Sequence, residues 1–149
     1  MPLSLKASTS RQYVMSAEIT LLFSDVQVAV GTGVTELFRV QNGTRIVGGV
    51  IVVETLFATA GTATLDLGDA VDPDRYTASV VNLETAALTA ITLTGFKYTT
   101  EDTIDATVVV GTAVTTAGQV YIRIDYVEDD KAHEQVPLAI ADYDPARAD

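Results

Sequence analysis

The feature that most restricts the fold of this chain is an apolar run between Arg45 and Glu54, which reads IVGGVIVV. Eight residues are too few to cross a bilayer as a helix, so we expect no membrane span. In an extended strand, successive side chains point to opposite faces. One face would carry Ile46, Val50 and Val52, and the other Val47, Ile51 and Val53. Such a strand belongs in the middle of a sheet or under a neighbouring subunit.

The composition favours β structure along the rest of the chain. Its 149 residues include 20 Val and 21 Thr, whose branched side chains pack well on pleated surfaces. The length fits one domain that can bury a core without staples, and there is no cysteine to form a disulfide. We therefore expect an all-β domain.

Strand and turn signals alternate through the chain. Asn42-Gly43 predicts a tight hairpin between strands 35–41 and 44–57, Gly48-Gly49 predicts a bulge or a close backbone approach, and Ala117-Gly118 predicts a turn. The last strand alternates cleanly, which puts Tyr121 and Tyr126 on opposite faces. About eight strands predict an antiparallel β-sandwich or jelly roll. The expected strands are 13–23, 35–41, 44–57, 62–67, 78–83, 90–98, 105–111 and 119–127.

Three zones are expected along the chain. Residues 1–12 form an N-terminal arm that carries Lys6 and Arg11 and no acid, residues 13–127 form the β-sandwich domain, and residues 128–149 form an acidic C-terminal tail. The net charge of −11 disfavours nucleic acid as a partner, because nucleic acid is itself densely negative. The first residues lack the continuous apolar segment of a signal peptide, so we expect no Sec-dependent secretion.

Four aspartates, Asp66, Asp69, Asp72 and Asp74, stand close together around a Gly-Asp turn. They are weak candidates for a bound calcium ion, because the spacing matches no known metal loop. The competing interpretation is structural. Asp72 precedes Pro73 and would cap a short turn, Asp74 would lie at its positive end, and Arg75 would pair with a neighbouring carboxylate. We therefore predict no metal and no cofactor.

Catalytic constellations are not evident in the sequence. The single histidine, His133, lies in the acidic tail and is a poor base for a serine triad. Glu101-Asp102 could serve as an acid–base pair only in a cleft, and the chain has no Trp to line a sugar site. Gly31-Thr32-Gly33 lacks the lysine of a phosphate-binding loop, so we interpret it as an ordinary loop. We predict that the protein is not an enzyme, although a glycosidase-like sandwich remains a third reading.

A family resemblance rests on the phrase VVETLFATAGTATLDLGDAVDPDRY, which follows the hairpin signal NGTRI and precedes the final strand TAGQVYIRIDYV. Over residues 34–127 the chain resembles the capsid decoration (cement) proteins of tailed bacteriophages. The resemblance implies a homotrimer on the outer surface of a phage head, which binds the major capsid protein and stabilises contacts between capsomers. It also implies a virion location, with assembly in the host cytoplasm.

Residues can be assigned to these contacts as expectations. Lys6 and Arg11 would meet acidic capsid surface, and Val50, Val52, Tyr121 and Tyr126 are candidates for the subunit interface. The alternative function is a calcium-dependent receptor- or sugar-binding head of a phage fibre, or another β-sandwich binding module.

Overall fold

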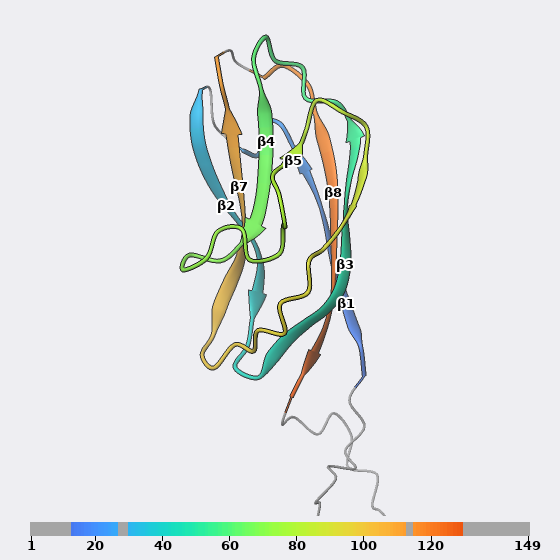
Figure 1. Ribbon diagram of the computed structural model, residues 1–149, viewed down its shortest axis with the longest axis vertical. Coiled ribbons are helices and arrows are strands. Elements are labelled where there is room, and N and C mark those ends of the chain that lie inside the picture. Colours follow the sequence, from blue (N-terminus) through green and yellow to red (C-terminus); the bar gives the residue numbers. More distant parts are fainter. Residues whose placement is uncertain (1–12, 27–29, 113–114, 130–149) are drawn as a thin grey trace, which may run out of the picture.

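The computed structural model describes residues 13–26, 30–112 and 115–129, which form eight β-strands and no helix. Two four-stranded antiparallel sheets pack face to face, as Figure 1 shows. In chain order the strands are β1 (Met15–Leu22), β2 (Gly31–Val40), β3 (Thr44–Thr55), β4 (Ala63–Gly68), β5 (Val81–Asn82), β6 (Leu88–Ala90), β7 (Asp102–Val110) and β8 (Gln119–Glu128). The predicted all-β sandwich of about eight strands is confirmed. Within the described ranges, no helix is long and apolar enough to span a membrane.

The strand order identifies the sandwich as a jelly roll. One sheet, sheet A, has the order β1-β8-β3-β6, and the other, sheet B, has the order β2-β7-β4-β5. The antiparallel pairs β1·β8, β2·β7, β3·β6 and β4·β5 are those of one long hairpin folded at the β4–β5 connection. The rolled hairpin closes where β8 also pairs with β3 and β7 with β4. Eight strands arranged as two Greek keys define this architecture.

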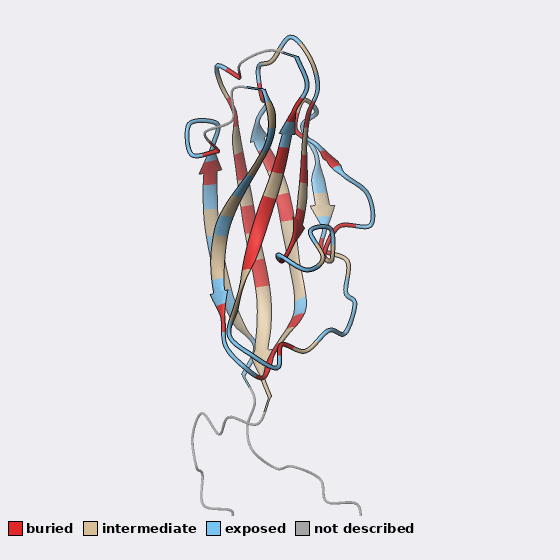
Figure 2. Cartoon of the chain, turned by 90° about the vertical axis from the view of Figure 1, so that its left-hand side faces the viewer, coloured by how far each residue is buried: buried red, intermediate tan, exposed pale blue. Residues whose placement is uncertain are grey.

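The core lies between the two sheets and follows the alternation of the strands. In β8, Val120, Ile122 and Ile124 are fully buried while the residues between them are half-buried, as the sequence predicts. The central strands β7 and β4 likewise bury Ile104, Val108 and Leu65 completely. Figure 2 shows the same alternation of buried and more exposed positions along the strands.

A bulge in β3 changes the predicted assignment of its faces. Ile46 pairs with Tyr126 and Gly48 with Asp125, so Val47 is an extra residue without a partner on β8. The extra residue reverses the alternation, and Ile46 points inward with Ile51 and Val53 instead of outward with Val50 and Val52. The predicted bulge and close approach are both present. A Cβ added at Gly49, whose φ is +146°, would lie 2.2 Å from the backbone oxygen of Arg123.

The predicted hairpin at Asn42-Gly43 is wrong. The tight turn exists, with the Thr44 amide donating to the Gln41 carbonyl oxygen, but β2 and β3 belong to different sheets. The turn is therefore a corner between the layers. Gly43 is needed there because its φ is +92° and an added Cβ would meet the backbone oxygen of Asp129 at 2.5 Å. A local turn signal cannot distinguish a hairpin from a corner.

Two further expectations fail where tertiary contacts outweigh local pattern. Residues 31–33, expected as a loop, begin β2 and pair with β7. Of the expected strand over 90–98, only Ala90 lies in a strand, as the last residue of β6. The segment after it leaves sheet A and crosses to β7 in sheet B. The amide of Thr92 donates to the Tyr76 carbonyl oxygen and that of Tyr98 to the Thr44 carbonyl oxygen. Isolated backbone hydrogen bonds, to Tyr76 in a loop and to the start of β3, therefore replace a continuous ladder.

Candidate assembly surfaces

The two lateral sides of the sandwich differ. On the side that we call the closed side, the edge strands β5 and β6 are two and three residues long, and segments 69–80 and 91–101 run beside them. On the open side, the edge strands β1 and β2 are eight and ten residues long. In Figure 1 the chain between β4 and β7 crosses the front of the sandwich, whereas β1 lies at its rear.

Asp69 organises the closed side. Its buried carboxylate accepts hydrogen bonds from the backbone amides of Val71 and Asp72 at 3.1 and 2.9 Å. It also forms an ion pair with Arg75, with 2.6 Å between Nε and Oδ2. The Asp69 side chain thus caps the turn at residues 69–72, which precedes the turn that Asp72 was predicted to cap. Asp72 accepts from the Arg75 amide through its backbone oxygen, and its carboxylate lies 3.7 Å from the Arg75 guanidinium. The predicted pairing of Arg75 with a neighbouring carboxylate is confirmed.

Two tyrosines connect this turn to the second segment of the closed side. The Tyr98 hydroxyl donates to Asp69 Oδ2 at 3.1 Å, and the Tyr76 hydroxyl donates to Tyr98 at 2.9 Å. The Arg75 guanidinium stacks on Phe96, 3.7 Å from the ring centre. Segments 69–80 and 91–101 are thus joined by a buried polar network whose members satisfy one another.

The ionisation states follow from this packing. Burial raises the pKa of Tyr98 and Tyr76, so both hydroxyls stay protonated and can donate. Burial alone would raise the pKa of Asp69 as well. The Arg75 hydrogen bond and charge, with the donors of Asp72 and Tyr98, outweigh burial and lower the pKa of Asp69 below its usual value. A carboxylate surrounded by donors and a cation is a structural anchor.

The four aspartates do not converge on one point that a cation could occupy. Asp66 accepts a hydrogen bond from the Thr77 hydroxyl at 3.1 Å, Asp69 points into the network, and Asp74 is exposed. Among the residues that the structure describes, no three acidic or histidine side chains are grouped as metal ligands would be. The structural interpretation of this stretch accounts for its contacts.

The outer face of sheet A carries three of the predicted interface residues. Tyr121 lies opposite Val52, which lies opposite Leu88, so the three form a row across β8, β3 and β6. Val50 lies on the same face opposite Arg123. Val50, Val52 and Tyr121 are half-buried and Leu88 is 67% exposed. The Tyr121 hydroxyl donates to Glu18 at 2.6 Å, which raises the pKa of the tyrosine.

Tyr126 lies on the other face of β8 and packs against the core, which confirms that the two tyrosines point in opposite directions. It lines an inner hollow between the sheets, where β1 begins and β8 ends. Ala17, Leu37, Phe38, Val40 and Ile124 supply the rest of its apolar wall. Polar side chains, Arg39, Gln41, Thr44 and Glu128, form the remainder of the lining.

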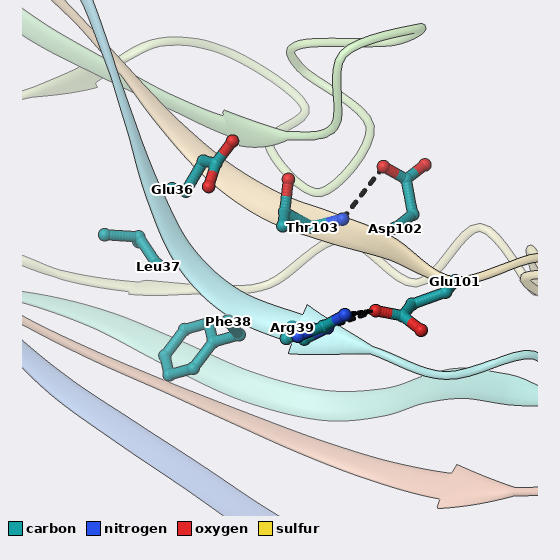
Figure 3. A pocket seen from close by; sticks show the side chains of 7 residues that line it. All are labelled: Glu36, Leu37, Phe38, Arg39, Glu101, Asp102 and Thr103. Atoms are coloured by element: carbon teal, nitrogen blue, oxygen red, sulfur yellow. Dashed lines mark hydrogen bonds and ion pairs between the residues drawn. The ribbon is translucent and has the colours of Figure 1, made fainter.

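A second, outer hollow adjoins β2 and is drawn in Figure 3. Its walls are residues 36–39 of β2 and residues 101–103 at the start of β7. The Arg39 guanidinium pairs with the Glu101 carboxylate, and the backbone amide of Thr103 bonds to the Asp102 side chain. Because Glu101 is engaged with a cation and Asp102 with its own backbone, the pair is not arranged as facing acid and base in a cleft. The two hollows share residues 37–39.

Leu37 marks an irregularity in the strand between the hollows. Glu36 pairs with Asp105 and Phe38 with Ile104, so Leu37 is an extra residue and a bulge. Near the bulge, Asp105 is buried, and its Oδ1 has no hydrogen-bond partner among the described residues. Burial raises the pKa of Asp105, and the charges of Glu36, Asp102 and Asp69 raise it further. The sequence alternation alone did not reveal either the hollows or this buried acid.

Some predicted residues lie outside the described ranges, namely Lys6, Arg11 and His133. Most of the predicted tail, residues 130–149, does so too. The capsid contacts expected for Lys6 and Arg11, and the zone boundaries at residues 12 and 128, therefore stay predictions.

Comparison with known proteins supports the fold. The chain is similar to one in the capsid asymmetric unit of cyanophage Pam1, with 20% identity and a TM-score of 0.61 over 85% of this chain and 92% of that one. It is also similar to a chain in the capsid of Ralstonia phage GP4, with 16% identity and a TM-score of 0.56 over 87% and 93%. It is likewise similar to a chain from the capsid of Helicobacter pylori bacteriophage KHP30, with 12% identity and a TM-score of 0.55 over 80% of this chain and 93% of that one. No protein-family model and no curated protein matches the sequence.

Proposed function

We propose that this protein is a structural subunit of a tailed-phage virion, which binds the outside of the capsid as a trimer and stabilises contacts between capsomers. The observation that carries the proposal is the fold. The same jelly roll recurs, over nearly the whole length, in chains from three phage capsid structures. Sequence identity is low, so the support comes from architecture together with the surfaces described above.

The surfaces favour a binding role over catalysis. The buried ionisable groups of the closed side are used to hold two segments together, and Glu101 is paired with Arg39. In contrast, the sheet A row of Tyr121, Val52 and Leu88 presents apolar surface at the centre of a wide face. Tyrosine at such a place suits an interface, because its ring tolerates burial and its hydroxyl tolerates water.

In the proposed trimer, this row lies against a neighbouring copy. A contact between two different surfaces repeats around an axis and closes as a ring when the rotation allows it. Three copies then present three equivalent contacts to the shell, and each weak contact strengthens the others through effective concentration. A net charge of −11 per chain opposes non-specific aggregation of the trimers before they meet the shell.

The test is to add the purified chain to empty phage heads that lack it and to image the particles by electron cryomicroscopy. We expect density in groups of three above the shell, and heads that withstand heating better than undecorated ones. A variant with Val52→Asp and Leu88→Asp should lose the groups of three. Heads that remain bare at saturating protein would contradict the proposal, as would density confined to the tail.

A further inference from the structure

The open side has an unpaired strand edge, that of β2, beside the two hollows. Strand β2 pairs with β7 along one edge only, and among the described residues no other strand lies along its second edge. Unpaired backbone groups on a long edge are a template for another strand. The bulge at Leu37 sits in the half of this edge that borders both hollows. A strand added here would extend sheet B.

The hollows combine apolar side chains with an acidic border. The inner hollow, between the sheets, is lined by the apolar side chains of Ala17, Phe38, Ile124 and Tyr126. Acidic side chains border the two hollows, namely Glu36, Glu101, Asp102 and Glu128, and Arg39 is the one basic residue among the lining groups. An added strand that fits both would place apolar side chains on its inner face and basic ones on its outer face.

The first residues of this chain have that chemistry. Leu3 and Leu5 alternate with Ser4 and Lys6, so an extended chain would turn both leucines to one face and Lys6 to the other. Within residues 1–12 the basic side chains are Lys6 and Arg11, and there is no acid. We propose that the groove beside β2 binds residues 1–12 of a second copy of the chain, with Leu3 and Leu5 in the inner hollow.

A second copy suits the groove better than the chain's own arm. The chain enters β1 at Met15, beside Tyr126 and hence at the end of the sandwich where the inner hollow lies. To lie in its own groove, the arm would have to reverse direction between residues 6 and 15. That stretch contains no Gly, Pro, Asn or Asp, and its turn-favouring residues are Ser8 and Ser10, which act more weakly. An arm that continues away from β1 reaches a neighbour instead.

This inference deepens the proposed trimer, because an arm-to-groove contact joins two different surfaces and can close a ring of three. It assigns Lys6 to a neighbouring subunit and not to the capsid. Both experiments below use the purified full-length chain without heads. Their failure would leave capsid binding standing, and bare heads in the decoration experiment would leave the arm contact standing.

The first experiment is photo-crosslinking. A photoreactive leucine analogue replaces Leu3 in the full chain, and equal amounts of ordinary and 15N-labelled copies are mixed before illumination. We expect crosslinks from position 3 to residues 37–41 or 124–128, many of them joining a light copy to a heavy one. Crosslinks within single copies only, crosslinks only to other surfaces, or no crosslinks would each overturn the proposal.

The second experiment changes the arm and leaves the sandwich intact. The variant L3S/L5S removes the apolar side chains, and S8A/S10A is the matched control in the same segment. Sedimentation of the full chains should show self-association weakened at least about tenfold by L3S/L5S, since two leucines lose their burial. The control should associate like the parent chain. Equal association of L3S/L5S and the parent would overturn the proposal.

Discussion

The open and closed sides of the sandwich differ in the length of their edge strands and in what lies beside them. On the closed side, the edge strands are only two and three residues long. The chain beside them is held in place by the ion pair of Asp69 with Arg75 and by the hydrogen bond from Tyr98 to Asp69. On the open side, β1 and β2 stay eight and ten residues long, with hollows beside β2. Proteins usually blunt long edges because such edges invite pairing. The long edge beside an apolar hollow is where we propose that a neighbouring copy binds.

This contrast predicts that changes in the polar network of the closed side affect stability, whereas changes along the open edge affect association. The largest effect is expected for Asp69→Ala, which leaves a buried guanidinium, a tyrosine hydroxyl and two backbone amides without their acceptor. The free energy of unfolding in urea should fall by about 3–5 kcal/mol, the usual cost of breaking a buried pair.

The matched control is Asp74→Ala, an acid on the same segment whose side chain is exposed. Its effect should stay within about 0.5 kcal/mol, as for most surface changes. Similar effects of the two substitutions would show that the network does not hold the closed side.

The next effect concerns the Tyr98 hydroxyl, which donates to Asp69 and accepts from Tyr76. Tyr98→Phe keeps the ring that meets Phe96 edge to face and removes only the hydroxyl. Urea unfolding should show a loss of about 1–3 kcal/mol, because Asp69 loses a donor and the Tyr76 hydroxyl loses its acceptor. An unchanged midpoint and slope would contradict a role for Tyr98 in joining the two segments.

A smaller effect, of opposite sign, is expected at Asp105, between the two sides. Its pKa is raised by burial and by like charges, so at pH values between the unfolded and the folded pKa the folded chain holds a proton that the unfolded chain releases. The stability from this group is present below its unfolded pKa and is lost as pH rises through the folded pKa. Asp105→Asn should therefore raise the free energy of unfolding at pH 7, where the ionised Asp105 is penalised by burial.

Asp69 gives the contrary pH dependence, since its pKa is lowered in the folded chain. Its contribution is present above the unfolded pKa and is lost as pH falls through the folded one. For Asp105→Asn, urea unfolding from acid to neutral pH should show the opposite trend. The increase in the free energy of unfolding over the parent chain should be largest at neutral pH and smallest in acid. A gain that does not change with pH would contradict the ionisation assigned to Asp105.

The smallest effect on stability, and the one most specific to the open side, is expected for Val34→Lys. Val34 is 63% exposed on the outer face of the edge strand β2, and lysine is a residue that proteins use to blunt such edges. Stability should change by no more than about 0.5 kcal/mol, while sedimentation should show weaker self-association. The control Val71→Lys, at an 84% exposed site on the closed side, should leave association unchanged. Equal effects of the two lysines would remove the distinction between the sides.

Features that depend on residues close together in the sequence could be predicted, whereas features that depend on contacts between distant parts of the chain could not. The alternation of β8, the bulge at Gly48-Gly49 and the Arg75 ion pair follow from neighbouring residues, and the sequence predicted all three. The turn at Asn42-Gly43 was recognised, but whether it joins strands of one sheet or two depends on distant pairing with β7 and β8. The same holds for the hollows, because β1, β2 and β8 meet there from separate parts of the chain.

The difference between the two sides can be measured directly by hydrogen exchange on the full-length chain, once at a dilution that separates the copies and once assembled. If the open side is the assembly surface, amides of β2 that do not pair with β7 should exchange rapidly in the dilute chain and become protected on assembly. Those of segment 69–80 should exchange equally in both states. Protection that appears at segment 69–80 and leaves β2 unchanged would contradict the assignment of the open side to assembly.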